Sequence, residues 1–286
     1  MLGADSASTY AFPSGPHHFN YGQKLFEIAD EQETGTLGIV TWGLGGLAFG
    51  SYRTMIAQLS DTLKANPPAS VLDVANRWIA QFWPVYTVSL ARDLAIFKLL
   101  AAKKPFVAET DAPDPGVRTI QEEIQYRQMK DNMVVGFCIG GYAPPNRQPA
   151  AFEIIFDPQL NGPPTPTQLP PAQSLWGVPA MIYRLIKGCG DEVRDAILAS
   201  GKWAGTPQEL DATIAPHKLQ HPTSVPIREA VDFIHACLLT TVKAMKFSPF
   251  PRLCGGPIEM AVITTDRKFR WVLHKKWDAA IKEAEQ

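Results

Sequence analysis

Hydrophobic residues gather in short continuous runs near both ends of the chain and recur at helical spacing between them. Residues 36–42 form a run of mostly β-favouring residues that ends at a cluster of glycines, which predicts a buried strand. The runs at 133–139 and 151–156 predict two more strands, joined by Gly-Gly-Tyr and a turn of prolines and asparagine. Residues 258–264 and 269–273 predict a closing strand pair.

Apolar residues at intervals of three and four predict helices in the middle of the chain. One is expected over 51–64, and a second begins after Ser70, whose hydroxyl would cap it. The apolar face of the second helix comprises Val71, Val74, Ala75, Trp78, Ile79 and Phe82. The same pattern continues towards Ala102, but Pro84 lacks a backbone N–H and predicts a kink or an end within it.

The clearest helical pattern lies near the end of the chain, over residues 224–246. Ser224 would cap this helix, and Pro226 would lie in its first turn. Its apolar stripe comprises Ile227, Val231, Ile234, Leu238, Val242 and Met245. Two shorter helices are expected between 178 and 200, and a polar helix closes the chain.

Proline-rich connections separate these elements. The loop over 103–116 precedes a polar helix that runs to about Lys130, and six prolines within 158–171 predict an exposed connection. Strands at both ends with helices between them indicate the α+β class, in a single domain over residues 1–286.

The composition favours a globular protein over nucleic-acid-binding and membrane proteins. With 45% hydrophobic and 19% charged residues, the chain is typical of a globular protein, and its net charge of −1 gives no footprint for nucleic acid or an anionic membrane. The apolar runs are broken by glycines and are too short to span a bilayer, and no secretory signal opens the chain. The four cysteines, Cys138, Cys189, Cys237 and Cys254, are widely spaced. We therefore expect reduced thiols and a cytoplasmic location.

The most specific chemical pattern lies in the first thirty residues. Gly3-Ala4-Asp5 predicts a small-small-Asp turn, and Lys24 opens the apolar run Leu25-Phe26-Glu27-Ile28. Three later segments accompany it in fixed order: Val-Gly-Phe-Cys-Ile-Gly-Gly-Tyr at 135–142, Phe-Glu-Ile at 152–154 with Asp-Pro after it, and Cys-Gly-Gly-Pro-Ile-Glu-Met-Ala-Val-Ile-Thr at 254–264.

In this order and spacing, the segments resemble the proteasome β-type subunits of the N-terminal-nucleophile (Ntn) hydrolases, over nearly the whole chain. The resemblance implies a four-layer αββα sandwich with loop insertions near 103–116 and 158–173, in a bacterial relative of the core subunits. It also implies hydrolysis of an amide or peptide substrate by threonine-peptidase chemistry and assembly as a homo-oligomeric ring. It implies no cofactor and no metal.

The resemblance also assigns the residues of the site. A Thr at the mature N-terminus of these enzymes attacks the amide, and its free amine acts as the base. Lys24 would be the ammonium that lowers the pKa of the hydroxyl and the amine, with Asp5 as its partner. Gly43 would donate a backbone N–H to the oxyanion. The alternative is an ordinary strand-end lysine, an Asx-turn aspartate and a turn glycine.

The chain also departs from the pattern of active subunits. It begins four residues before Asp5, so the strand that would carry the nucleophile is missing. Ser-Leu-Trp-Gly-Val at 174–178 stands in place of Gly-Ser-Gly-Ser, and Phe-Pro-Arg-Leu-Cys at 250–254 lacks the expected aspartate. We therefore expect a truncated polypeptide that is inactive as it stands. A non-catalytic scaffold or assembly relative is the alternative.

A further alternative is a dinucleotide-binding protein, because Gly43-x-Gly45-x-x-Ala48 fits the fingerprint Gly-x-Gly-x-x-Ala after a strand. However, no acidic residue ends a second strand about twenty residues on, since Asp61 falls inside a predicted helix.

The remaining histidines and Cys254 offer weaker candidates. His217 and His221 have metal-ligand spacing but lie between two prolines, so a solvated pair is expected. The neighbours His17 and His18 fall in a Pro/Gly loop that we expect at the surface, and His235 is expected to be a core or boundary residue of its helix. Cys254 stands at the family's Ser position, where packing is a better explanation than nucleophilic chemistry.

Overall fold

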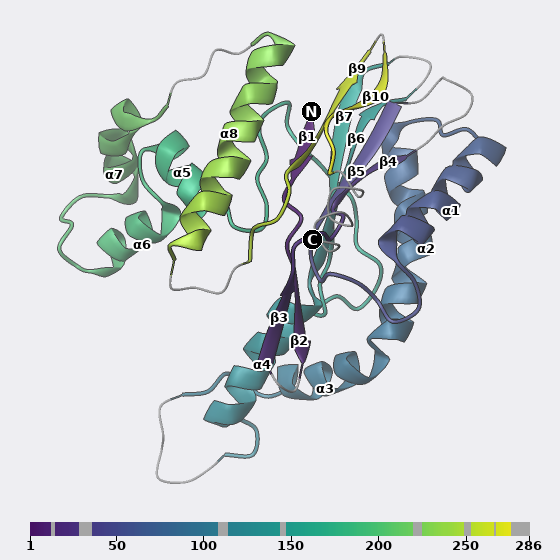
Figure 1. Ribbon diagram of the computed structural model, residues 1–286. Helices are drawn as coiled ribbons and strands as arrows, with labels where there is room; N and C mark the ends of the chain where they lie inside the picture. Colours follow the sequence, from purple (N-terminus) through teal and green to yellow (C-terminus); the bar gives the residue numbers. More distant parts are fainter. Residues whose placement is uncertain are drawn as a thin grey trace, which may run out of the picture. The chain divides into compact units, whose positions relative to one another are not determined.

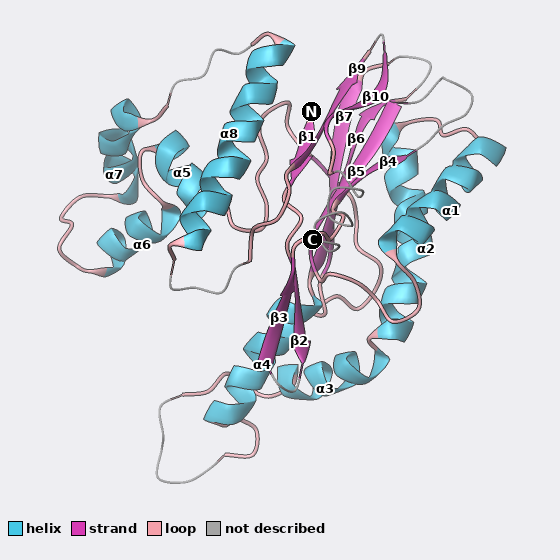
Figure 2. Cartoon of the chain, in the orientation of Figure 1, coloured by secondary structure: helices cyan, strands magenta, loops and turns pink. Residues whose placement is uncertain are grey.

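The computed structural model describes residues 1–12, 15–28, 36–107, 114–143, 147–219, 225–248, 253–265 and 267–275. The chain divides into two compact units. Unit 1 comprises residues 1–23, 174–262 and 271–286, and unit 2 comprises residues 24–173 and 263–270. Both helices and strands are present (Figures 1 and 2), which confirms the α+β class. The four-layer sandwich stays a prediction.

Unit 2 is built on a five-stranded antiparallel sheet in the order β4-β5-β6-β7-β8. The strands are β4 (Leu25–Ile28), β5 (Thr36–Gly43), β6 (Val135–Tyr142), β7 (Pro149–Phe156) and β8 (Thr167–Gln168). The three predicted strands 36–42, 133–139 and 151–156 are confirmed as β5, β6 and β7, although Met133 ends a helix rather than opening β6. The edge strand β8 forms inside the proline-rich connection, where two residues are too few to show a period.

Four helices of unit 2 follow the predicted order: α1 (Tyr52–Ala65), α2 (Val71–Ser89), α3 (Ala91–Ala101) and α4 (Ile120–Met133). The predicted cap at Ser70 is confirmed, because its hydroxyl oxygen accepts the backbone N–H of Asp73. Ser51 caps α1 in the same way, and Thr119 and Glu122 form a capping box at the start of α4.

Pro84 does not end its helix, because α2 continues for five residues beyond it to Ser89. The Thr87 hydroxyl donates to the carbonyls of Trp83 and Pro84, in the turn that follows the proline. Phe82 and Tyr86 are both fully buried on either side of Pro84. Tertiary packing therefore keeps the helix intact, and the break comes at Leu90, between α2 and α3.

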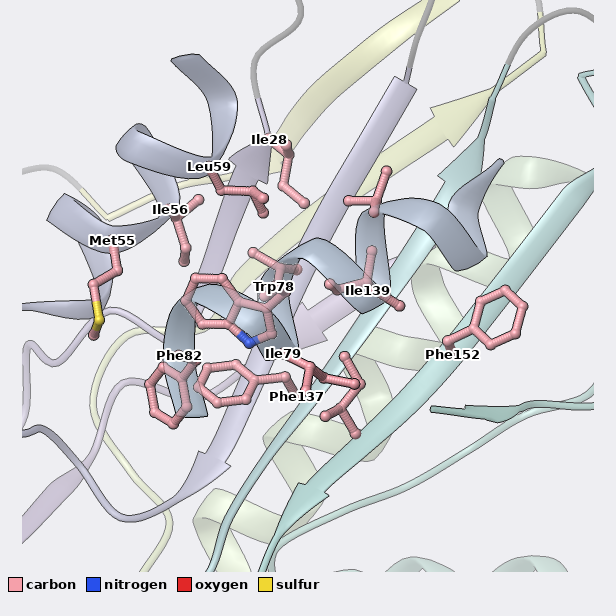
Figure 3. Packing of buried hydrophobic residues seen from close by; sticks show 14 of the residues in the cluster. Ile28, Met55, Ile56, Leu59, Trp78, Ile79, Phe82, Phe137, Ile139 and Phe152 are labelled. Carbon is pink, nitrogen blue, oxygen red and sulfur yellow. The ribbon is translucent and has the colours of Figure 1, made fainter. Parts of the chain in front are cut away.

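The hydrophobic core of unit 2 lies between the sheet and its covering helices. Helix α1 contacts β4, and α2 contacts β6 and β7. All six residues of the predicted apolar face of α2 are buried. Trp78 lies at the centre, 0% exposed, with its ring centroid 4.9 Å from that of Phe137 and 5.2 Å from that of Phe82 (Figure 3).

A buried arginine joins α3, the following loop and α4. The Arg118 guanidinium donates to the Glu123 carboxylate at 2.6 Å and to the carbonyls of Leu100 and Lys103 at 3.0 Å each. It also lies 4.1 Å from the centroid of the Tyr126 ring. Hydrogen bonds from Arg118 and Arg127 lower the pKa of Glu123 to about 2.

Unit 1 contains strand β1 and the last helices of the described residues. Its strand β1 (Leu2–Ala4) pairs antiparallel with β9 (Glu259–Thr264), which neighbours β10 (Arg267–Leu273). The division between the units falls within β9 and within β10. Two further strands, β2 (Ser8–Phe12) and β3 (Gly15–Phe19), pair as a separate two-stranded sheet. The predicted final strand pair is confirmed.

The helices of unit 1 are α5 (Ala180–Lys187), α6 (Asp191–Ala199), α7 (Pro207–Ile214) and α8 (Ile227–Lys246), with a 3₁₀ turn at Ala215–His217. The two short helices are confirmed, whereas α7 was not predicted. Pro226 is the N-cap of α8 rather than a first-turn residue. The expected cap Ser224 and the closing helix lie outside the described residues.

Helix α8 packs closely on β1 through a glycine. A Cβ atom on Gly3 would lie 2.8 Å from Cγ2 of Ile234 and 2.9 Å from Cδ1 of Leu238, so a larger residue would push the helix away. The predicted stripe therefore faces β1 in its middle, while Ile227 at its start is exposed. No described helix is both long enough and apolar enough to cross a membrane.

We predict that Trp78→Ala lowers the free energy of unfolding by about 3–5 kcal/mol, because it opens a cavity in a closely packed core. Urea denaturation, monitored by far-UV circular dichroism because the substitution removes a fluorescent tryptophan, measures the change in unfolding free energy. Val88→Ala, on the exposed side of the same helix, is the matched control and should change stability by less than about 0.5 kcal/mol. Equal effects of the two substitutions would contradict the described core.

We also predict a pH-dependent role for Glu123. Its folded-state pKa of about 2 lies below the ordinary value of 4.5, so the ionised carboxylate favours the folded state. That contribution is complete above the unfolded pKa and is lost as the pH falls from 4.5 through about 2. The wild type should unfold at a higher urea midpoint than Glu123→Gln. This difference should be constant near neutral pH and should disappear at low pH. Glu229→Gln, at an exposed position of α8, should show the same difference from the wild type at every pH in this range.

Candidate functional site

Lys24 lies immediately before β4 in unit 2 and is half-buried. Its backbone carbonyl accepts the N–H of Thr41 at 2.9 Å, which extends the pairing of Leu25 with Val40 by one residue. The lysine is therefore a strand-end residue whose backbone is fixed by the neighbouring strand β5.

Gly43 ends β5, and the local backbone explains why this position needs a glycine. Its φ of +84° lies in the left-handed region, and a Cβ atom would lie 2.3 Å from the Val134 carbonyl oxygen. The next residue, Leu44, donates its N–H to that same oxygen at 2.8 Å. These constraints account for a turn glycine, and the role of Gly43 towards an oxyanion stays a prediction.

The sheet brings Lys24 and Gly43 to the same end of unit 2. Lys24 is opposite Thr41, and Gly43 is two residues further along β5, a separation of roughly 7 Å along the strand. Thr41 is buried and donates its hydroxyl to the Gly136 carbonyl at 3.1 Å, so this end of β5 is held on both sides.

Asp5 belongs to unit 1, where it follows β1 and is buried. Its Oδ2 accepts the N–H of Ala7 at 3.1 Å and of Gly255 at 2.8 Å. Ser6 donates its N–H to the Gly255 carbonyl at 2.9 Å. The predicted turn at Asp5 is present, and it is tied to a loop 250 residues away in the sequence. The pairing of Asp5 with Lys24 rests on the resemblance alone.

A buried charged cluster of unit 1 was not predicted from the sequence. Glu259 is 0% exposed, and its two carboxylate oxygens lie 3.2 Å from Nζ of Lys275 and 2.8 Å from Nδ1 of His274. Lys275 is itself buried. The sequence did contain a signal for this cluster. Glu259 is an acidic residue within the otherwise apolar strand 258–264, and a buried acidic residue needs a partner.

The histidine predictions have mixed outcomes. His17 and His18 lie in β3, opposite Tyr10 and Thr9, so the predicted loop is wrong, because pairing with β2 overrides the local Pro/Gly composition. His17 is exposed, as expected, and His18 is half-buried. His217 is exposed in the 3₁₀ turn, and His221 lies outside the described residues. His235 is half-buried on α8. The described residues contain no group of three or more His, Cys, Asp or Glu suited to a metal ion.

The four cysteines all lie in the described part of the chain, and none forms a disulfide there. Cys138 and Cys237 are buried, whereas Cys189 and Cys254 are half-buried. Burial, together with the nearby Glu153 carboxylate, raises the pKa of the Cys138 thiol to about 12. That thiol is therefore a packing group and not a nucleophile.

The glycine motif 43–48 lies between β5 and α1, as the dinucleotide alternative requires. Both neighbours of β5 in the sheet, β4 and β6, run antiparallel to it. A dinucleotide-binding unit places its helix between parallel strands, so this sheet gives the alternative no support.

We predict that Gly43→Ala destabilises the protein by about 2 kcal/mol or more, because it combines a left-handed backbone with a steric clash. Gly177→Ala has a similar φ of +82° but no atom within 4 Å of the added Cβ, so it should cost about 1 kcal/mol. Gly162→Ala has neither constraint and should be neutral or stabilising. Urea denaturation ranks the three variants by their loss of unfolding free energy. If Gly43→Ala loses no more than Gly177→Ala, the contact between Gly43 and the Val134 carbonyl is not as close as described.

A scan against protein-family models finds no match to this chain, and a search among curated proteins finds no significant match. Its possible function therefore rests on the motifs and on the geometry of the described residues.

Proposed function

We propose that this chain is of the Ntn amide or peptide hydrolase type, in which activity requires a Thr, Ser or Cys nucleophile at the mature N-terminus. The observation that supports the proposal best is the common position of Lys24 and Gly43 at one end of the unit 2 sheet. Attack on an amide needs an activated nucleophile and a donor to the developing oxyanion, and an ammonium and a backbone N–H are groups of those kinds.

In the proposed reaction, a hydroxyl or thiol at the mature N-terminus attacks the carbonyl carbon, and the α-amine takes up its proton. The Lys24 ammonium stabilises the deprotonated nucleophile, and the N–H of Gly43 donates to the oxygen that becomes negative. The protonated amine then transfers its proton to the leaving nitrogen, and water hydrolyses the acyl intermediate. Asp5 as the partner of Lys24, the αββα sandwich and ring assembly belong to this proposal.

The second candidate is a non-catalytic scaffold, and the contacts of Asp5 favour it. Two backbone N–H groups already bind one oxygen of this carboxylate, so a structural role explains its burial. The turn geometry likewise explains Gly43 without catalysis. The two candidates differ in whether the native protein carries a reactive N-terminal residue.

The first test uses protein purified from its native source. Intact mass and N-terminal sequencing identify the mature N-terminus, and a peptide vinyl sulfone labels a reactive nucleophile there. A labelled Thr, Ser or Cys supports the hydrolase. An unlabelled protein with no hydrolysis of fluorogenic peptides supports the scaffold instead.

In native protein that hydrolyses peptides, we predict that Lys24→Ala reduces hydrolysis by about 10²-fold or more, since it removes a charge that stabilises the activated nucleophile. Lys64→Ala is the matched control, because Lys64 lies in the same unit and its contact with Asp61 is a helix-surface pair. The control should keep wild-type rates. Equal activity of the two variants would exclude Lys24 from catalysis, provided that circular dichroism shows both to be folded.

A further inference from the structure

The buried pair Lys275–Glu259 contacts the chain at two positions that are far apart in sequence. Lys275 Nζ donates to the Gly22 carbonyl at 3.1 Å as well as to the Glu259 carboxylate at 3.2 Å. Glu259 lies in β9, where it pairs in register with Ala4 of β1. Ala4 directly precedes the segment 5–22 and Gly22 ends it, so these contacts lie at the two ends of that segment.

Backbone hydrogen bonds join the two ends of this segment directly. Gly22 donates its N–H to the Ser6 carbonyl at 2.9 Å, and Ser6 donates its own N–H to Gly255. A Cβ atom on Gly22 would lie 2.1 Å from the hydroxyl of Ser8, so the two ends approach closely. The strands β2 and β3 lie between these ends, and two paired strands are marginally stable by themselves.

Burying an ion pair costs desolvation free energy, so the Lys275–Glu259 pair needs an explanation beyond stability. Two charges lose their hydration on burial, and a pair of well-packed apolar residues is often equally stable. An apolar pair, however, cannot bind a carbonyl oxygen at a defined place. Lys275 has donors for a carboxylate and a carbonyl at once, and it holds both. His274 Nδ1 lies by the second Glu259 oxygen, and its ring is 4.2 Å from that of Trp271.

We propose that Lys275 and Glu259 are positioning residues that clamp the two ends of the segment 5–22. The clamp fixes Asp5 on one side, directly after Ala4, and Gly22 on the other. The clamp itself follows from the contacts of unit 1, and its consequence for catalysis rests on the proposed function.

The test compares amide hydrogen exchange in the full-length protein and in the double variant Lys275→Met/Glu259→Gln. The double variant leaves no buried unpaired charge, so it should fold where Lys275→Met alone is strongly destabilised. The N–H groups of Ser6 and Gly22 should exchange about tenfold faster in the double variant, as the loss of one charged hydrogen bond implies. The N–H of Leu219, which donates to Ile186 elsewhere in unit 1, should exchange at the wild-type rate.

Lys187→Met removes a lysine from an exposed ion pair with Asp191 and is the matched control, with no expected change at Ser6 or Gly22. Unchanged exchange at these two amides in the double variant would overturn the clamp. Equal acceleration at Leu219 would also overturn it, because that result means general destabilisation.

In native protein that hydrolyses peptides, the double variant should lower kcat by up to about 10²-fold with KM unchanged, as misplacement of catalytic groups does. Wild-type kcat in that variant would overturn the role of the clamp in catalysis. A wild-type protein without hydrolytic activity would instead overturn the proposed function, and the exchange measurement would still decide the clamp.

Discussion

The close contact between β5 and β6 is the constraint on which the candidate site of unit 2 depends. The Trp42 ring occupies the space of a side chain at Gly136, since a Cβ atom there would lie 2.1 Å from the indole. One residue further along β5, Gly43 approaches the Val134 carbonyl. Because a slip of one residue would turn every side chain of a strand to the opposite face, these contacts also fix which residues face α1 and α2.

The elements with strong periodicity could be predicted from the sequence. The apolar face of α2 and the runs that became β5, β6 and β9 have enough residues to show a period, and each is buried as expected. Caps such as Ser70 act within four residues, so they too are visible locally. Lys24 and Gly43 were singled out by the resemblance, and the pairing of β4 with β5 that brings them to one end of the sheet was not predicted.

The features that sequence patterns missed depend on contacts between distant residues. Pro84 is accommodated by the burial of Phe82 and Tyr86, a tertiary effect that outweighs a local preference. The strand β3 needs β2 as its partner, and α7 is short, although its Thr206–Glu209 capping box was a readable signal. The burial of Lys275 could not be predicted, because its partners lie 16 and 253 residues away.

Unit 1 is made of three separate stretches of sequence, and this has a consequence for folding during synthesis on the ribosome. Most of unit 2 is one uninterrupted stretch, residues 24–173, so its core can assemble while later residues are still being synthesised. Unit 1 joins segments that are far apart in the sequence, as the hydrogen bond between Gly255 and Asp5 shows across 250 positions. Strand β1 must therefore wait until β9 has been synthesised before it can pair, and during that interval its edge is open to wrong pairings.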